Sequence, residues 1–439
     1  MRFLIHDVFD FGAHYGDLDS GADDELVDAI LEQGARFAET ELVPLNRSGD
    51  EQGCVWRDGA VSAPEGFKAA YETYVEGGWP ALAGNPEYGG QGLPNSIGLW
   101  VEEMMSSANI AWTMYGSLSR GAISAIDSHG SDALKTDYLP RLLSGEWTGT
   151  MCLTEPHCGS DVGLLRTKAR VEADGSYRID GTKIFISAGE HDLSDNIVHL
   201  VLARLPDAPA GTKGISLFIV PKKLDGKTNG VTCGGIEEKM GLHGNATCTM
   251  HFEGARGFLV GAENDGMRCM FTMMNEARLA VGMQGVALME QGFQASLAYA
   301  QERLQMRALG GPVMSEGPAD PIIVHPDVRR MLLTQKACVE GCRALGYFAV
   351  QFADRVRFGD ADNAAQAERM LGLLTPIVKG FATEIGYESV NHAVQVFGGH
   401  GFIRENGVEQ LVRDGRITLI YEGTTQIQAL DLLARKVLM

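Results

Sequence analysis

The order of hydrophobic periodicities along the chain is the feature that most limits its fold. From about residue 22 to 146, in segments such as DELVDAILEQGARFAETEL, apolar residues recur every three to four positions, as in amphipathic helices. Around Gly149 the pattern changes to short β-branched runs between Gly, Asp and Pro, such as YRIDGTKIFISA and GISLFIVPKK, which predict strands. After about Gly266 the helical period returns and continues to Met439, interrupted by a Gly- and Pro-rich loop at Leu309–Pro321.

This order predicts an α+β multidomain protein. We expect an N-terminal helical domain at 1–148, a middle domain at 149–266 that forms an antiparallel β-barrel or sandwich, and a C-terminal helical bundle at 267–439. A chain of 439 residues is long enough for three such cores. No βαβ alternation occurs and no G-x-G-x-x-G follows a strand, so a Rossmann dinucleotide site is not supported.

Composition excludes several classes of function. With 37 Lys+Arg against 57 Asp+Glu, the net charge of −20 repels phosphates, which argues against general binding of nucleic acids or anionic membranes. No stretch approaches the roughly 18 apolar residues of a membrane span. The first segment, MRFLIHDVFDFGAH, contains acids and does not resemble a targeting peptide, and the eight cysteines lack metal-ligand spacing. We therefore expect a cytoplasmic protein with reduced thiols and no metal site.

Two segments of the β region have the residues of a binding site. MCLTEPHCGSD, residues 151–161, ends a strand in a polar loop, where Thr154 and Ser160 offer hydroxyls to a heteroaromatic ring or a phosphate. A decorated barrel turn explains this loop equally well. In Lys183–Ser187, alternation places Phe185 and Ser187 on one face, which suits the stacking and hydrogen bonding of a flavin. The alternative, Phe185 as barrel core, is compatible with the same periodicity.

The C-terminal helical region carries two further candidates. Arg278, in Asn275-Glu-Ala-Arg278, and Arg303 lie on one long helical pattern, where a guanidinium is costly unless it meets a carboxylate or a phosphate. For either arginine alone, an ion pair between helices is the favoured interpretation. In QVFGGHG, residues 395–401, consecutive glycines end a helix and allow close approach of a ligand, whereas a simple helix cap needs only one glycine.

The last candidate is the segment IYEGTTQ, residues 420–426. Thr425 and Gln428 match a capping box, which predicts a helix that begins near Thr425. Glu422 then lies just before the helix, next to Gly423 and after an apolar run. Partial burial would raise the pKa of its carboxyl toward that of a general base. Alternatively, Glu422 is a surface residue that interacts favourably with the helix dipole.

Together and in this order, these motifs resemble the acyl-CoA dehydrogenase family over about residues 85 to 439. The carrying motifs are MCLTEPHCGSD, GTKIFISAG, the helix from Arg278 to Arg303, QVFGGHGF, RD and IYEGTTQIQ. A long N-terminal region and an insertion reaching His325 resemble the larger branch of the family, which includes 3-methylmercaptopropionyl-CoA dehydrogenase. Where the family often has R-x-x-F-G, this chain has Arg303-Leu-Gln-Met306, so the family's local adenine contacts are not carried over.

The resemblance implies FAD-dependent α,β-dehydrogenation of an acyl-CoA thioester to the 2,3-enoyl-CoA. Glu422 falls on the family's catalytic base, which takes the α-proton while the β-hydrogen leaves as hydride to the flavin. The residues that fall on cofactor contacts are Met151, Leu153, Thr154, Gly159, Ser160, Phe185, Ile186, Ser187, Arg303, Gln395, Gly398, Gly399, Thr424 and Gln426. Those that fall on acyl-CoA contacts are Ser160, Asn275, Arg278, Tyr421, Glu422 and Gly423.

The resemblance also implies partners. Electrons would pass to an electron-transferring flavoprotein, and Arg303 would reach FAD across the subunit interface of a homo-oligomer, a dimer or a dimer of dimers. Trp112 and Tyr115 fall where the family's acyl pocket closes, which favours a short or medium acyl chain. Two alternatives are a flavin oxidase or monooxygenase on the same fold, whose members commonly lack the glutamate, and a non-catalytic acyl-CoA- or flavin-binding protein. The presence of Glu422 argues against the first alternative, and Glu422, Arg278 and the flavin loop together argue against the second.

Overall fold

The computed structural model describes residues 1–438, so Met439, the last residue of the predicted C-terminal domain, lies outside it. The chain divides into two compact units, which are described separately. The helix–sheet unit comprises Asp19–Glu102 and Asn109–Ala277, and the helical unit comprises Met1–Leu18, Glu103–Ala108 and Arg278–Met439. Two long helices, α5 (Asn95–His129) and α7 (Gly266–Glu302), contribute residues to both.

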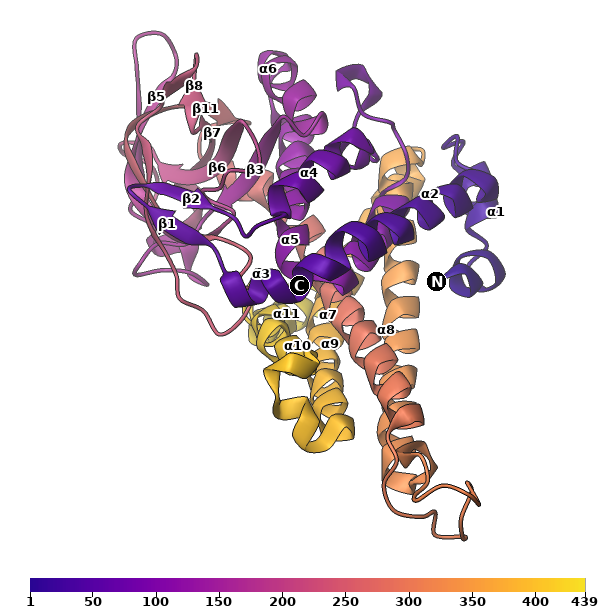
Figure 1. The fold of residues 1–439 in the computed structure, drawn as a ribbon. Coiled ribbons are helices and arrows are strands. Elements are labelled where there is room, and N and C mark those ends of the chain that lie inside the picture. The colour runs from indigo at the N-terminus through magenta and orange to yellow at the C-terminus, as the bar shows by residue number, and fades with distance from the viewer. Residues whose placement is uncertain (439) are drawn as a thin grey trace. The chain divides into compact units, whose positions relative to one another are not determined.

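The helices predicted for the N-terminal region are present. Those that lie wholly in the helix–sheet unit are α2 (Asp24–Phe37), α3 (Val43–Gln52), α4 (Phe67–Glu76) and α6 (Asp132–Leu143) (Figure 1). α2 begins at Asp24, where the Asp23 carboxylate caps it by accepting a hydrogen bond of 2.8 Å from the Leu26 N–H. A hairpin of β1 (Val55–Arg57) and β2 (Ala60–Ser62), which periodicity did not predict, interrupts the helices.

The middle domain is a closed β-barrel. Its strands are β3 (Trp147–Cys152), β4 (Lys168–Val171), β5 (Tyr177–Ser187), β6 (Asn196–Arg204), β7 (Ile215–Pro221), β10 (Val231–Ile236) and β11 (Thr247–Val260), with a small β8 (Lys223–Leu224) and β9 (Lys227–Thr228) hairpin beside them. The pairing β11-β5-β4-β6 closes because β7 pairs with both β6 and β11. The expectation of a purely antiparallel sheet is wrong in two places, since β3 and β4 each pair with β6 in parallel.

Strand β6 shows why the strands of this barrel have continuous apolar runs in their sequence. Alternate residues such as Leu200 face a core shared with α5 and α6, whereas Val201 and Ala203 face the barrel interior. Because both faces of the strand are buried, the hydrophobic alternation of a half-exposed strand is absent. β6 is therefore packed on both faces, and exposed polar groups of the β-domain lie in the loops at its strand ends.

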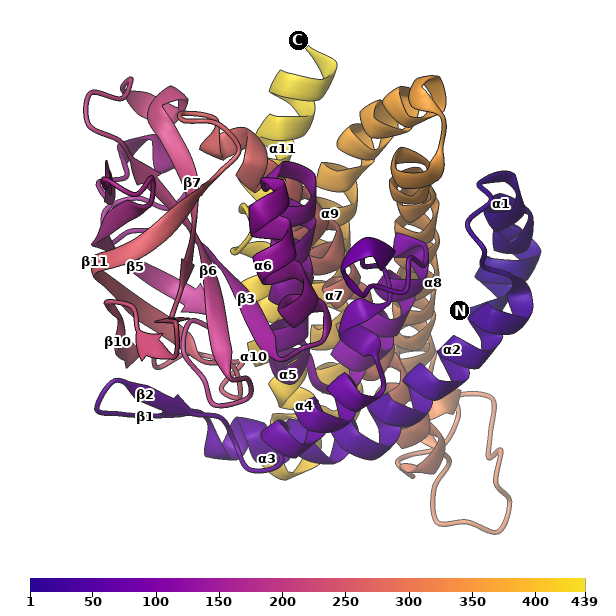
Figure 2. The ribbon, with the colours of Figure 1, turned by 90° about the horizontal axis from the view of Figure 1, so that it is seen from above.

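The helical unit is built on a long helical hairpin. α8 (Pro326–Phe358) and α9 (Ala361–Phe397) lie side by side in Figure 2, and the remaining helices are α1 (Phe11–Asp17), α10 (Val408–Gly415) and α11 (Thr425–Leu430), the last followed by the π-helical segment Asp431–Val437. The second part of α7 packs very closely on α9. A Cβ at Gly285 would lie 2.5 Å from the Ala382 carbonyl oxygen, so only glycine permits this approach.

The insertion after α7 is an ordered loop, as its Gly and Pro content predicts, with no helix or strand between Glu302 and Ile322. Its centre is the buried Asp320 carboxylate, which accepts hydrogen bonds from the N–H groups of Ala308, Val313 and Met314 at 2.8 to 3.1 Å. Hydrogen bonds from Met314 and Ala308 lower the pKa of Asp320 to about 2. The carboxylate therefore holds the loop in one shape.

The predicted fold class is confirmed: a helical N-terminal domain, a central β-domain and a C-terminal helical bundle. The individual domain boundaries stay a prediction. Among residues 1–438, no helix combines the length and the apolar character that crossing a membrane requires.

Candidate active site

The two motifs of the β-domain meet at the end of strand β5. The Ile184 N–H donates to the Thr154 carbonyl at 2.9 Å, so the polar loop and the Phe185 segment lie side by side. At this point the β5–β11 register shifts, and Phe185 adopts a left-handed φ of 59°. Phe185 is 59% exposed, which excludes the alternative that it belongs to the barrel core. Ile186 is buried in that core, so only its main chain can face a ligand.

A buried ion pair, which the sequence interpretation missed, joins these motifs. Lys183 is 0% exposed, and its Nζ lies 2.9 Å from Glu155 Oε1 and 3.0 Å from the Leu153 carbonyl. Glu155 also accepts from the N–H groups of Arg166 and Thr167 at 2.7 and 3.0 Å. Burial alone would raise the pKa of Glu155, but the charge of Lys183 and these hydrogen bonds lower it below its usual value. The sequence feature that could have indicated this ion pair is a lysine within a strand of alternating apolar residues.

The other predicted residues of this region differ in exposure. Met151 and Leu153 are partly buried against the core under α5 and α6, whereas Gly159 and Ser160 are exposed on the polar loop. Ser187 is half-buried at the end of β5, and Asn275 is exposed on α7. The loop thus presents main-chain groups and hydroxyls, while its apolar side chains anchor it.

Three potential metal ligands, Glu155, His157 and Cys158, have atoms within 4.8 Å of one another, although sequence spacing predicted no metal site. The Glu155 carboxylate already pairs with the Lys183 ammonium and accepts hydrogen bonds from two main-chain N–H groups. Its charge is therefore neutralised within the protein, and the arrangement is explained without an ion.

The predicted base lies on a strained turn of the helical unit. Glu422 is half-buried with a φ of 54°, and Gly423 follows with a φ of 90°. Helix α11 begins at Thr425, as predicted, but the predicted cap is wrong by one residue. Thr424 has the extended conformation of an N-cap, and its hydroxyl accepts from the Ile427 N–H. The Gln428 amide instead donates to the Glu422 and Gly423 carbonyls, at 3.1 Å each.

Two buried cations also hold this turn. Arg278 is 3% exposed, and its Nε donates to the Glu422 carbonyl at 3.3 Å while Nη1 lies 3.5 Å from Asp431 Oδ2. The ion pair between helices, favoured for Arg278 alone, is therefore present. Lys379 on α9 donates from Nζ to the Gly423 carbonyl at 2.7 Å. The Tyr421 hydroxyl donates to the Gln284 side chain of α7, which fixes the residue before the base.

The electrostatics of the turn suit a general base. Burial raises the pKa of Glu422 to about 7, although the charges of Arg278 and Lys379 act in the opposite direction. The Glu422 carboxylate and its main-chain N–H have no hydrogen-bond partner within residues 1–438. Near neutral pH, about half of these carboxyls are ionised and free to accept a proton.

The glycine motif at the end of α9 contacts α7 at Tyr299, one helical turn before Arg303. The Tyr299 ring stacks on Phe397 with centroids 4.1 Å apart, and its hydroxyl lies 2.7 Å from His400 Nδ1. Arg303 follows Tyr299 by one helical turn, and its guanidinium has no partner in the part of the chain that the structure describes. Cβ atoms built at Gly398 and Gly399 meet nothing within 4 Å. Gln395 and Gln426 are exposed on α9 and α11.

These surfaces fit the parts of FAD. An exposed aromatic ring beside hydroxyl and main-chain groups suits a flavin ring, and an unpaired guanidinium near open glycine backbone suits a diphosphate. Each surface lies within one of the two units.

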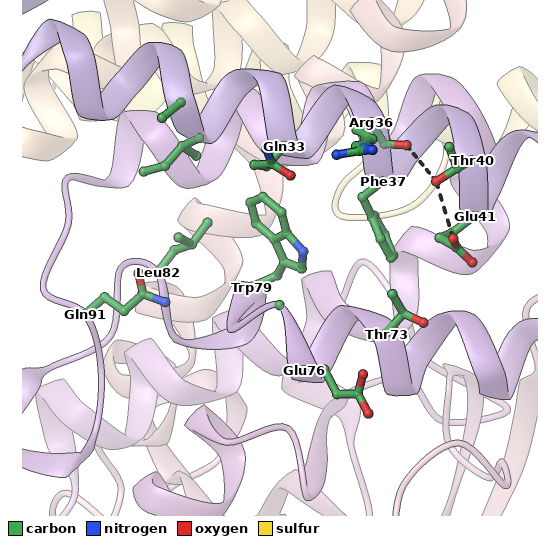
Figure 3. A pocket seen from close by; sticks show the side chains of 13 residues that line it. Gln33, Arg36, Phe37, Thr40, Glu41, Thr73, Glu76, Trp79, Leu82 and Gln91 are labelled. Carbon is green, nitrogen blue, oxygen red and sulfur yellow. Dashed lines mark hydrogen bonds between the residues drawn. The ribbon is translucent and has the colours of Figure 1, made fainter.

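A separate hollow lies in the helix–sheet unit, between α2 and α4. It has a volume of about 670 Å³, and Figure 3 shows the rings of Phe37 and Trp79 between the two helices, with Arg36 on α2 and Glu76 on α4 among the lining residues. None of the predicted site residues lines it.

Models of the acyl-CoA dehydrogenase N-terminal, middle and C-terminal domains match residues 24–146, 150–255 and 264–438. The chain belongs to the acyl-CoA dehydrogenase family. As an acyl-CoA dehydrogenase it is an FAD-dependent oxidoreductase, which confirms the predicted activity and cofactor.

Relatives of this acyl-CoA dehydrogenase support the assignment. 3-Methylmercaptopropionyl-CoA dehydrogenase of Ruegeria pomeroyi is 48% identical over 93% of this chain and 70% of its own length. A chain from work on the electron-transferring flavoprotein of Acidaminococcus fermentans and flavin-based electron bifurcation is 26% identical, with a TM-score of 0.77 over 92% of this chain and 96% of that one. An acyl-CoA dehydrogenase complexed with FAD from Bacillus anthracis is 25% identical, with a TM-score of 0.79 over 94% and 66%.

Proposed function

We propose that Glu422 is the base that removes the α-proton of a bound acyl-CoA thioester. The observation that carries the proposal is the geometry of its turn: a carboxylate without a partner, on a backbone that three side chains hold in a left-handed conformation. A pKa of about 7 gives this carboxylate the proton affinity that a base needs at neutral pH. Gly423 must be glycine, because a Cβ there would lie 2.7 Å from Gln428 Nε2 at a φ of 90°.

A thioester α-proton is too weakly acidic for a carboxylate unless the developing enolate is stabilised. The main-chain N–H of Glu422, which is unpaired among the described residues, is suited to donate to the thioester carbonyl. Bound FAD supplies the two-electron acceptor for the β-hydrogen. Phe185 and Thr154 would hold the flavin ring, and Arg303 with Gly398 and Gly399 would hold the diphosphate.

We infer a short acyl-CoA substrate. The named substrate of the Ruegeria relative has a short acyl chain, and the bulky side chains of Trp112 and Tyr115 fall where the resemblance to the family would place the closed end of the acyl pocket. The Trp112 indole donates to the Phe67 carbonyl at 3.1 Å, and the Tyr115 hydroxyl to the Gly244 carbonyl at 3.2 Å. Both rings are buried and fixed by these bonds, so at the closed end of an acyl pocket they would limit the length of the acyl chain rather than adapt to it.

We also propose that an electron-transferring flavoprotein accepts the electrons, which is supported by the similarity to the Acidaminococcus chain. A homo-oligomer, a dimer or a dimer of dimers, is supported by the unpaired Arg303, whose expected phosphate partner would belong to the other subunit's cofactor. Eight free cysteines are consistent with the proposed location in the cytoplasm.

The test is the Glu422→Gln variant. The amide keeps the size and hydrogen bonding of the side chain but cannot accept the proton, so FAD and acyl-CoA should still bind. Anaerobic stopped-flow bleaching of the flavin should slow by about 10²- to 10⁴-fold, the usual scale for loss of a general base. Glu388→Gln, an exposed carboxylate on the same unit, is the matched control and should bleach normally. Bleaching of Glu422→Gln within about tenfold of wild type would exclude Glu422 as the base.

A further inference from the structure

Lys379 is a buried ammonium in an apolar stretch of α9. The stretch Pro376–Ala382 reads PIVKGFA, and the lysine side chain is 0% exposed. Among residues 1–438, its one hydrogen-bond acceptor is the Gly423 carbonyl, and no carboxylate forms an ion pair with it. A buried ammonium that has no carboxylate within ion-pair distance opposes folding, whereas leucine or methionine would fill the same space. The fold alone therefore gives no reason for a lysine at this position.

The turn formed by Glu422 and Gly423, called the base turn below, gives a reason for this lysine. Gly423 follows Glu422, and both adopt left-handed backbone that an unsupported chain rarely keeps. Arg278 pairs with Asp431 and donates to the Glu422 carbonyl, and the neutral Gln428 amide is shared between the Glu422 and Gly423 carbonyls. Lys379 is thus the charged donor to the Gly423 carbonyl in the described chain.

We propose that Lys379 is a positioning residue for the base: its ammonium holds the Gly423 carbonyl and thereby the turn that aims the Glu422 carboxylate and main-chain N–H. This inference rests on the proposed role of Glu422. Because Lys379 is fully buried on α9, its Nζ has little freedom to move, and its bond to the Gly423 carbonyl defines where the turn lies. A shift of about 1 Å in such a position can cost about 10²-fold in rate.

The same ammonium tunes the charge of the base. The charged groups that face Glu422 and its turn come from three elements: Arg278 on α7, Lys379 and Glu384 on α9, and Asp431 and Arg435 on the C-terminal π-helical segment. The positive charges of Arg278 and Lys379 lower the pKa of Glu422 against the effect of burial. Burial lowers the pKa of Lys379 itself to about 8, so it is charged at neutral pH. Removing its charge should therefore raise the pKa of Glu422.

The experiment measures the anaerobic flavin-reduction rate against pH for Lys379→Met, with wild type and Glu422→Gln alongside. The rate at neutral pH should fall about 10- to 100-fold. The acidic limb of the profile should move up by about one pH unit, the lower end of the effect of a nearby charge. Binding of the enoyl-CoA product, followed by the flavin spectrum, should change less than about threefold, because Lys379 holds the turn and not the ligand.

The matched control is Thr383→Val. Its hydroxyl is also fully buried, one turn further along α9, and donates to the Lys379 carbonyl at 2.7 Å without contacting the base turn. This variant should keep the wild-type acidic limb, which separates loss of positioning from general damage to the helix.

Lys379→Gln is the second variant. Its amide is neutral but keeps a hydrogen-bond donor, so it can be measured in place of Lys379→Met if that variant does not fold. It should shift the acidic limb as the methionine variant does while losing less rate. An unshifted limb in both variants, or in Lys379→Gln alone if the other is unfolded, overturns the proposal. If Glu422→Gln retains the wild-type rate, the base assignment fails instead.

Discussion

The buried Lys183–Glu155 pair should be essential to both the stability of the β-domain and its hold on FAD. Lys183→Met removes the ammonium and leaves the Glu155 carboxylate buried at 4% exposure, with only its hydrogen bonds for compensation. Breaking a buried ion pair from one side costs about 3–5 kcal/mol. Three donors remain to Glu155, from Arg166 N, Thr167 N and Thr167 Oγ1, so we expect the lower end of that range, about 3 kcal/mol.

The consequence for FAD follows from what the pair connects. Lys183 also donates to the Leu153 carbonyl, and the next residue, Ile184, donates to the Thr154 carbonyl. Loosening this junction displaces the polar loop from Phe185, so flavin binding should weaken together with stability. The assay is urea unfolding followed by circular dichroism, with equilibrium dialysis of FAD on the same variants.

A double-mutant cycle tests the reasoning. In Lys183→Met/Glu155→Gln no unpaired charge remains, so the double variant should be destabilised by less than the sum of the single variants, with a coupling of about 1–3 kcal/mol. Lys168→Met, at an exposed position of β4, is the control and should change stability by no more than about 0.5 kcal/mol. A cost below about 1 kcal/mol for Lys183→Met, the value of an exposed ion pair, would refute the argument.

Two further predictions concern the base and the interface. The second-order rate of flavin reduction at low acyl-CoA should fall about tenfold for each pH unit below about 7 and level off above it, because only ionised Glu422 accepts the proton. A rate independent of pH over this range would contradict a titrating base with this pKa. Arg303→Ala should weaken FAD binding in equilibrium dialysis without changing the circular dichroism spectrum. Light scattering should show flavin-loaded wild type as at least a dimer, and a flavin-loaded monomer would exclude binding across subunits.

The sequence by itself determined the layers of the fold, and it supplied the residues that we propose for the site. Helical periodicity, the β-branched runs and the Gly- and Pro-rich joints each depend on local interactions, which a linear pattern records directly. They predicted the helical, β and helical order and the start of the helix at Thr425. The same patterns missed the β1–β2 hairpin and placed the cap of α11 one residue too late.

Tertiary structure alone decided which residues support the site. Lys183 and Glu155 are 28 residues apart, and Lys379 and Gly423 are 44 apart, so no local pattern connects them. The parallel pairings of β3 and β4 with β6 and the left-handed backbone of Glu422 also depend on contacts across the fold. A buried charge is tolerated only where a distant partner satisfies it, and a strained backbone only where surrounding side chains hold it. The three-dimensional packing supplies both conditions.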